Sequence, residues 1–222
     1  MQVARSTSLP RATAGRLLAS LLDEGLVESP AAGRWVLGYE LTRLGKAADT
    51  HTRVRELARP ALAELSHQSS ESAMLGVMTG HRSEVILQID PPRLITPTNW
   101  VGRPLGLHAS AGGKLLLASL RPAELGDWLT GRELPRYTSR TITDPDALAG
   151  ELRRVRRRGY AETIDELEEG LSGIAVPVPD SEPALALAVS GPSARLGVSQ
   201  RAAAVAAAQA TASRLRQALT IS

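Results

Sequence analysis

Apolar residues near the N-terminus recur at the spacing of a helix. The segment between Pro10 and Gly25 predicts a helix of about 13 residues, because proline suits the first turn and glycine suits the position after the last. One face is rich in leucine and comprises Ala14, Leu17, Leu18, Leu21 and Leu22. The opposite face carries small side chains and one arginine: Ala12, Thr13, Arg16, Ala19 and Ser20. A solvated face is normally rich in Lys and Glu, so this one is open to close approach by another molecule.

The pattern after this helix changes to short β-prone stretches. Residues 26–29 and 34–41 flank a turn that contains proline and glycine, which predicts a small hairpin. A helix followed by a hairpin is typical of the second half of a winged helix-turn-helix. Helical spacing resumes over residues 40–49 and 54–66. Because the composition changes there, we expect one domain over residues 1–45 and a second over residues 46–222.

Strand-like and helical segments alternate along the second domain. The predicted strands cover residues 72–78, 84–89, 173–178 and 184–191, and the predicted helices cover residues 110–120, 144–158 and 198–219. Ser110 and Asp144 are typical N-cap residues, and Gly159 is typical of a helix end. This alternation predicts a domain in which helices pack on a sheet.

Composition and charge narrow the class of protein. The chain has 222 residues, 43% of them hydrophobic, which is enough for a buried core in one or two domains. It has no cysteine, no apolar signal segment and no run of ~18 apolar residues, so we expect a cytoplasmic protein without a membrane partner. The formal charge of +3 is carried by Arg5, Arg11 and Arg16, because the remainder of the chain is balanced. A basic N-terminal segment favours a polyanion such as DNA.

A search for catalytic patterns does not indicate an enzyme. The residues around Lys114 lack the spacing of a phosphate-binding loop, and those around Ser172 lack that of a nucleophile elbow. The histidines are scattered and no cluster has metal-ligand spacing, so we predict no metal and no cofactor. The acidic residues within 165–169 and the five arginines within 153–158 are typical of solvated segments. The alternative for the acidic cluster is a metal or acid–base site, and the alternative for the arginine cluster is a second nucleic-acid-binding patch.

Two interpretations of the first helix are open at this point: DNA recognition, and an ordinary packed helix. Small side chains allow a helix to approach the floor of the roughly 12 Å wide major groove, while arginine and threonine reach phosphates or base edges. The candidate DNA-binding residues are Arg11, Ala12, Thr13, Arg16, Ser20 and Arg34.

Four ordered stretches resemble one known family. They are LPRATAGRLLASLLDEGLVE at residues 9–28, LHASAGGKLLLA at 107–118, GYAETIDELEEGLSGIAVPV at 159–178 and LALAVSGPSARL at 185–196. Together they resemble the IclR family of bacterial transcriptional regulators, and the match covers essentially the whole chain. The resemblance implies an α+β fold with an N-terminal winged helix-turn-helix, a linker helix and a C-terminal GAF-like α/β effector-binding domain. It also implies homodimers or homotetramers that act on a double-stranded DNA operator.

The resemblance also implies an effector pocket. In the family, backbone amides at the start of the LHASAGGK helix hold the effector's carboxylate, which here assigns that role to Ala111 and Gly112. The remaining pocket positions fall on Thr163, Gly173, Ala188 and Ser190. Relatives that recognise small keto acids carry Asp, Cys and Ser at the first three of these. A small organic acid is therefore expected, and the larger, less polar pocket here favours an aromatic one.

The N-terminus departs from the family pattern. Only nine residues precede Pro10, whereas family members carry another full helix before this point. Residues 1–8 supply a short helix before the turn, with Val3 and Ala4 as its apolar contacts. The winged helix-turn-helix would then lack its first helix and leave the leucine face uncovered. Either the true start codon lies upstream, or this form of the protein binds DNA poorly; we expect the former.

The sequence as a whole predicts an effector-responsive transcriptional regulator of a catabolic or metabolic operon, either a repressor or an activator. The alternative is a small-molecule sensor that has lost DNA binding and acts through protein contacts. An enzyme that uses the pocket is a third class, and no nucleophile–base pair or metal set supports it.

Overall fold

The chain divides into two compact units between Thr52 and Arg53. The structure, a computed structural model, describes residues 2–31, 33–47, 51–79, 82–93, 98–103 and 105–221. The first unit contains, in chain order, α1 Gln2–Ser6, α2 Arg11–Asp23, β1 Val27–Ala31, β2 Arg34–Leu37 and α3 Tyr39–Ala47.

The first unit has the predicted helix followed by the predicted hairpin. Helix α2 begins directly after Pro10 and ends two residues before Gly25, whose φ of +67° is the left-handed conformation that terminates helices. Strands β1 and β2 pair antiparallel, with Val27 opposite Leu37. The short helix α1 precedes α2 as expected and contacts it. This order of elements is the one that the sequence predicts for the second half of a winged helix-turn-helix.

The leucine face of α2 is largely exposed. Ala14 is the buried residue of this helix, whereas the exposed fractions of Leu17, Leu21 and Leu22 are 50%, 39% and 41%. The interpretation of α2 as an ordinary packed helix therefore lacks its main support, because the described residues do not cover the leucines. Both faces of α2 are accessible within this unit.

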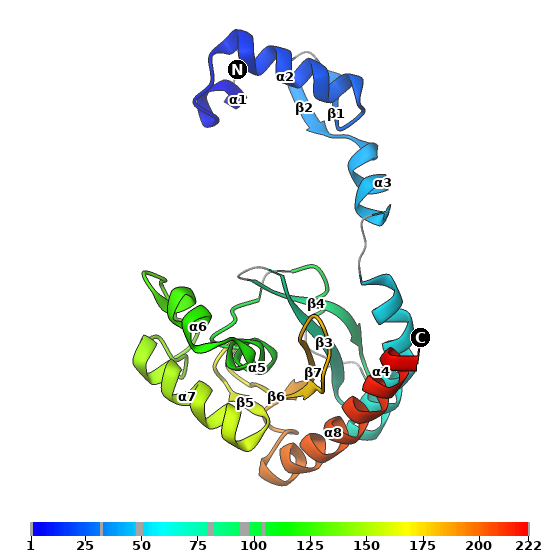
Figure 1. Ribbon diagram of the computed structural model, residues 1–222, viewed down its shortest axis with the longest axis vertical. Helices are drawn as coiled ribbons and strands as arrows, with labels where there is room; N and C mark the ends of the chain where they lie inside the picture. The colour runs from blue at the N-terminus through cyan, green and yellow to red at the C-terminus, as the bar shows by residue number, and fades with distance from the viewer. Residues whose placement is uncertain are drawn as a thin grey trace. The chain divides into compact units, whose positions relative to one another are not determined.

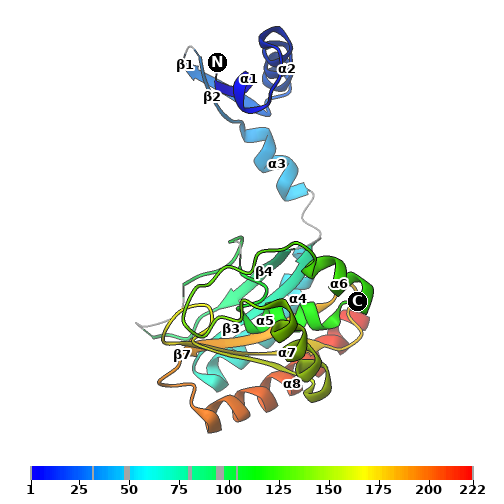
Figure 2. The ribbon, with the colours of Figure 1, turned by 90° about the vertical axis from the view of Figure 1, so that its left-hand side faces the viewer.

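The second unit is an antiparallel sheet with helices on both faces. Its strands span Ser72–Thr79 (β3), Arg82–Ile89 (β4), Ala161–Ile164 (β5), Leu171–Val178 (β6) and Leu185–Pro192 (β7). In the sheet they follow the order β4-β3-β7-β6-β5. The helices are α4 Thr52–Ser69, α5 Ala111–Ser119, α6 Pro122–Leu129, α7 Pro145–Arg158 and α8 Val198–Ile221. Figure 1 shows α4 and α8 along one face of the sheet and α5, α6 and α7 over the other, and Figure 2 shows the same unit turned by 90°.

Alternation along the strands divides the core into two layers. Ile174, Val176 and Val178 of β6 face the layer that α4 and α8 cover, whereas Ala175 of the same strand faces the layer below α5 and α7. The small residues on the second face leave room between the sheet and α5. The sequence predicted β3, β4, β6, β7 and the helices α5, α7 and α8 within a few residues, and it missed β5 and α6.

Candidate functional site

The N-terminus of α5 is held tightly against the segment that precedes it. The Ser110 hydroxyl accepts a hydrogen bond from the Gly113 amide at 3.2 Å and donates one to the Gly106 carbonyl at 3.1 Å. A Cβ at Gly113 would lie 2.4 Å from the Leu107 carbonyl oxygen, so only glycine fits there. The first amides of a helix have no partner inside the helix, which leaves those of Ala111 and Gly112 available to a ligand.

A cavity lies between the start of α5 and the sheet. It is partly enclosed and partly open to solvent. The six predicted effector-binding residues all line it: Ala111, Gly112, Thr163, Gly173, Ala188 and Ser190. They come from α5, β5, β6 and β7, so the fold brings together residues that are up to 79 positions apart. Their role in binding stays a prediction.

The cavity is mostly apolar and none of its described lining residues is charged. The Ser190 hydroxyl donates a hydrogen bond to the Ser172 carbonyl at 3.2 Å. A Cβ at Gly173 would lie 3.5 Å from Thr163 Oγ1 and 3.7 Å from the Ala111 Cβ, so a side chain at this position would take up space between β6 and α5. The start of α5 is therefore the element with the strongest electrostatic preference for an anion in this cavity.

Sequence reasoning missed the wall formed by Trp100. A buried side chain, Gln88, holds this segment in place: its Oε1 accepts a hydrogen bond from the Trp100 amide at 3.0 Å, and its Nε2 donates to Asp90 Oδ1 at 2.8 Å. Met74, Val85 and Leu105 complete the apolar wall. The sequence signal for this wall was a glutamine within a strand-like apolar segment, because the side-chain amide of a buried glutamine must be hydrogen-bonded to a neighbouring segment.

A buried ion pair joins α5 to the loop between β5 and β6. The Lys114 ammonium donates to both carboxylate oxygens of Glu166, each at 2.6 Å, and Lys114 is 1% exposed. Burial raises the pKa of Glu166, although the attraction of Lys114 opposes this shift. The next residue, Leu167, lines the cavity, so the pair fixes one of its walls.

Some residues of the two charged clusters, the acidic one within 165–169 and the arginine one within 153–158, have structural roles. Asp165 accepts hydrogen bonds from the Ser193 hydroxyl and the Gly170 amide. Arg156 donates from Nε to the Ala118 carbonyl at 2.6 Å and from Nη2 to the Leu120 carbonyl at 2.8 Å, which satisfies the end of α5. No group of three potential metal ligands exists among the described residues.

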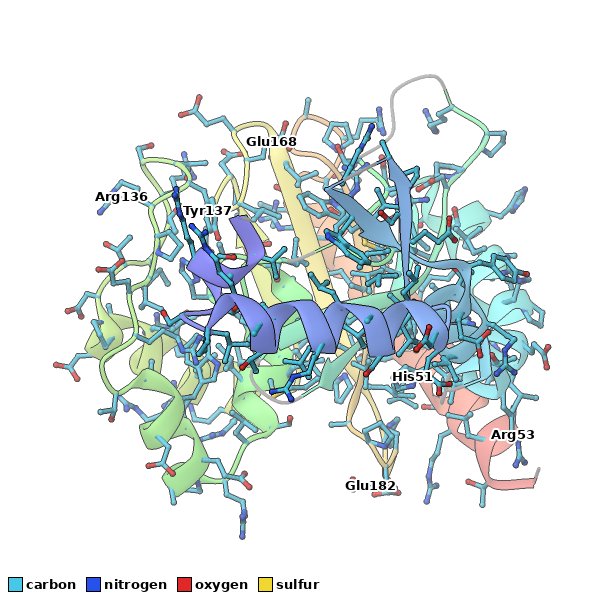
Figure 3. All side chains as sticks on the ribbon, turned by 90° about the horizontal axis from the view of Figure 1, so that it is seen from above. His51, Arg53, Arg136, Tyr137, Glu168 and Glu182 are labelled. Carbon is cyan, nitrogen blue, oxygen red and sulfur yellow. The ribbon has the colours of Figure 1, made fainter. Side chains whose placement is uncertain are left out.

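The predicted DNA-binding residues lie on the surface of the first unit. Arg11, Ala12, Arg16 and Ser20 on α2 are exposed, Thr13 is half-buried, and Arg34 is exposed at the start of β2. None of the three arginines forms an ion pair with a described residue, so their charges are free to meet phosphates. Figure 3 shows α2 with its side chains drawn as sticks. Their contact with DNA stays a prediction.

Comparison with known families decides the assignment. The family model for the bacterial transcriptional regulator IclR C-terminal domain matches residues 46–217, and the model for the IclR helix-turn-helix domain matches residues 1–31. The chain belongs to the IclR family.

Individual relatives agree with this assignment. The HTH-type transcriptional regulator BhcR of Paracoccus denitrificans is 34% identical over 88% of this chain and 71% of its own length. The transcriptional repressor IclR of Escherichia coli is 28% identical over 88% of this chain and 73% of its own length. An IclR homologue from Microbacterium hydrocarbonoxydans, solved in complex with 4-hydroxybenzoate, superposes with a TM-score of 0.79 and is 26% identical over 99% of this chain and 90% of that one.

These findings identify an IclR-family regulator that binds DNA and responds to an effector. They confirm the predicted fold and function class, and they do not favour a sensor without DNA binding. The homologues are transcriptional regulators and not enzymes. Within the described residues, no helix is long and apolar enough to cross a bilayer.

Proposed function

We propose that the effector is an aromatic carboxylate that binds in the cavity below α5. The observation that supports this most directly is the combination of an uncharged, mostly apolar cavity with the free amides of Ala111 and Gly112 at one end. The helix terminus would hold the carboxylate, and Trp100 would contact the flat ring. The Microbacterium relative was solved with such an acid, 4-hydroxybenzoate.

The DNA-binding part of the proposal rests on α2. Its flank of Arg11, Ala12, Thr13, Arg16 and Ser20 would lie in the major groove, and Arg34 on the hairpin would contact the adjacent phosphates. Small side chains on this flank allow the helix backbone to approach the bases. The target is an operator of a catabolic or metabolic operon, and the protein would act on it in the cytoplasm as a homodimer or homotetramer.

A calorimetric titration tests the effector site. We expect 4-hydroxybenzoate and benzoate to bind more tightly than pyruvate and glyoxylate, because only the aromatic acids fill the apolar walls. Tight binding of the short keto acids without binding of the aromatic acids would refute the proposed ligand class.

A matched pair of substitutions at Gly112 tests the role of the backbone amide. Gly112→Pro removes the N–H in the first turn, where proline is tolerated, and should weaken 4-hydroxybenzoate binding about tenfold or more. Gly112→Ala keeps the N–H, and its Cβ meets no protein atom within 4 Å, so it should lose less affinity than Gly112→Pro. Equal affinities of the two variants would exclude this amide from the carboxylate site.

A further inference from the structure

A second cavity adjoins the first on the other side of the segment that precedes α5. It is lined by residues 105–108, by the end of α6 and by the segment that follows it. Among the described residues, Ser83 and Leu105 alone line both cavities. The second cavity is open to solvent, and none of the predicted effector-binding residues lines it.

Aromatic side chains form one wall of this second cavity. The rings of His108 and Tyr137 stack with their centroids 5.6 Å apart and their planes 28° from parallel. A Cβ at Gly106 would lie 2.8 Å from the Tyr137 hydroxyl oxygen, so this ring position depends on glycine. His108 Nε2 is hydrogen-bonded to the Pro135 carbonyl at 2.9 Å, and burial lowers the pKa of the imidazole. Burial therefore favours the uncharged form of this ring.

Another part of the lining carries a positive charge. The Arg132 guanidinium lies 4.6 Å above the Trp128 ring centroid, and its Nε donates to the Trp128 carbonyl at 2.9 Å. No described residue accepts a hydrogen bond from its terminal nitrogens Nη1 and Nη2. The guanidinium is thus held in place with its outer edge available to a carboxylate, which is the geometry that favours bidentate binding.

The charges of the lining residues differ between the two cavities. The described lining of the second cavity has one cation, Arg132, and one anion, Glu133, and both side chains are exposed. The described lining of the first cavity has no charge. A simple carboxylate would be attracted by Arg132 and repelled by Glu133. A ligand that carries both a carboxylate and an ammonium group matches both residues.

We propose that the second cavity is a separate ligand site for an amino acid with an aromatic side chain. Arg132 would bind the carboxylate, Glu133 would bind the ammonium group, and the ring would lie against the Tyr137 side of the aromatic wall. Figure 3 shows Tyr137 and the neighbouring Arg136 together at this edge of the second unit.

The three tryptophans of the chain allow the two cavities to be observed separately. Trp100 lines the first cavity, Trp128 lines the second, and Trp35 lies in the hairpin of the first unit. In a W35F/W100F variant of the full chain, the emission of Trp128 therefore reports the second cavity alone. The probes are L-phenylalanine, 3-phenylpropionate, which lacks the ammonium group, and phenethylamine, which lacks the carboxylate.

We expect L-phenylalanine to change the Trp128 emission saturably and the two single-charge probes to bind at least about tenfold more weakly. Arg132→Gln should weaken L-phenylalanine binding by a similar factor. Arg136→Gln is the matched control, because it removes the same charge four residues away on a side chain that does not line the cavity.

The proposal is overturned if L-phenylalanine causes no saturable change, if 3-phenylpropionate binds as tightly as L-phenylalanine, or if the two arginine variants behave alike. Binding of 4-hydroxybenzoate to the unsubstituted chain is measured independently. Failure at the second cavity is therefore distinguishable from failure of the proposed effector site.

Discussion

Replacing Lys114 by methionine tests whether the ion pair with Glu166 holds the wall of the effector cavity. Methionine occupies a similar volume but leaves the Glu166 carboxylate without its partner in a largely buried position. Both carboxylate oxygens lie 2.6 Å from the Lys114 nitrogen. Charges at ~3 Å in an effective dielectric of ~20 attract by about 5 kcal/mol, and breaking a buried pair typically costs about 3–5 kcal/mol. We expect a loss of about that size at pH 8.

The loss should depend on pH with a defined sign. Burial already raises the pKa of Glu166 in the folded protein, and Lys114 counteracts this, so Lys114→Met raises that pKa further. Glu166 of the folded variant then keeps its proton at pH values where Glu166 of the unfolded chain, with a pKa of ~4.3, has already released it. Stability of the variant therefore falls as the pH rises from that value through the raised folded pKa, and the destabilisation is smaller at pH 5 than at pH 8.

Urea unfolding at the two pH values measures the effect. The double variant Lys114→Met/Glu166→Gln removes both charges and should recover most of the lost stability, together with the pH dependence. Because Leu167 follows Glu166 and lines the cavity, the single variant should also bind 4-hydroxybenzoate more weakly. A destabilisation below about 1 kcal/mol at pH 8, or one that is equal at both pH values, would refute the reasoning.

Three further predictions concern other parts of the chain. Arg16→Ala should weaken binding to operator fragments selected from genomic DNA and lower the slope of log binding constant against log salt concentration by about 1. Arg153→Ala, in the second unit, should leave both the affinity and the slope unchanged. Gel-shift titrations at several salt concentrations measure both quantities. Gly113→Ala should destabilise by about 1–3 kcal/mol in thermal unfolding, because its Cβ would lie 2.4 Å from a backbone oxygen. Gly112→Ala should be neutral or stabilising by up to about 1 kcal/mol, and equal effects at the two glycines would contradict the packing argument. Gln88→Ala should lower the affinity for 4-hydroxybenzoate more than that for acetate in calorimetry, and an equal loss for both would show that the Trp100 segment does not contact the ring.

The sequence by itself determined the features that depend on neighbouring residues. Asp144 accepts the Ala147 amide at 2.7 Å and Gly159 has a φ of +78°, so the two ends of α7 were predictable from local chemistry. The hairpin of the first unit and the long strands were predictable in the same way, because turn residues and alternation act over a few positions. The family motifs then named six pocket residues, which the structure places around one cavity.

Tertiary structure alone decided the contacts between distant parts of the chain. The pairing of Lys114 with Glu166 joins residues 52 positions apart, and no periodicity in either segment encodes it. Strand β5 has four residues, too few for a clear alternation, and it forms because β6 offers it a hydrogen-bonded edge. Local patterns specify the elements, whereas the surfaces that they present to one another determine which side chains meet.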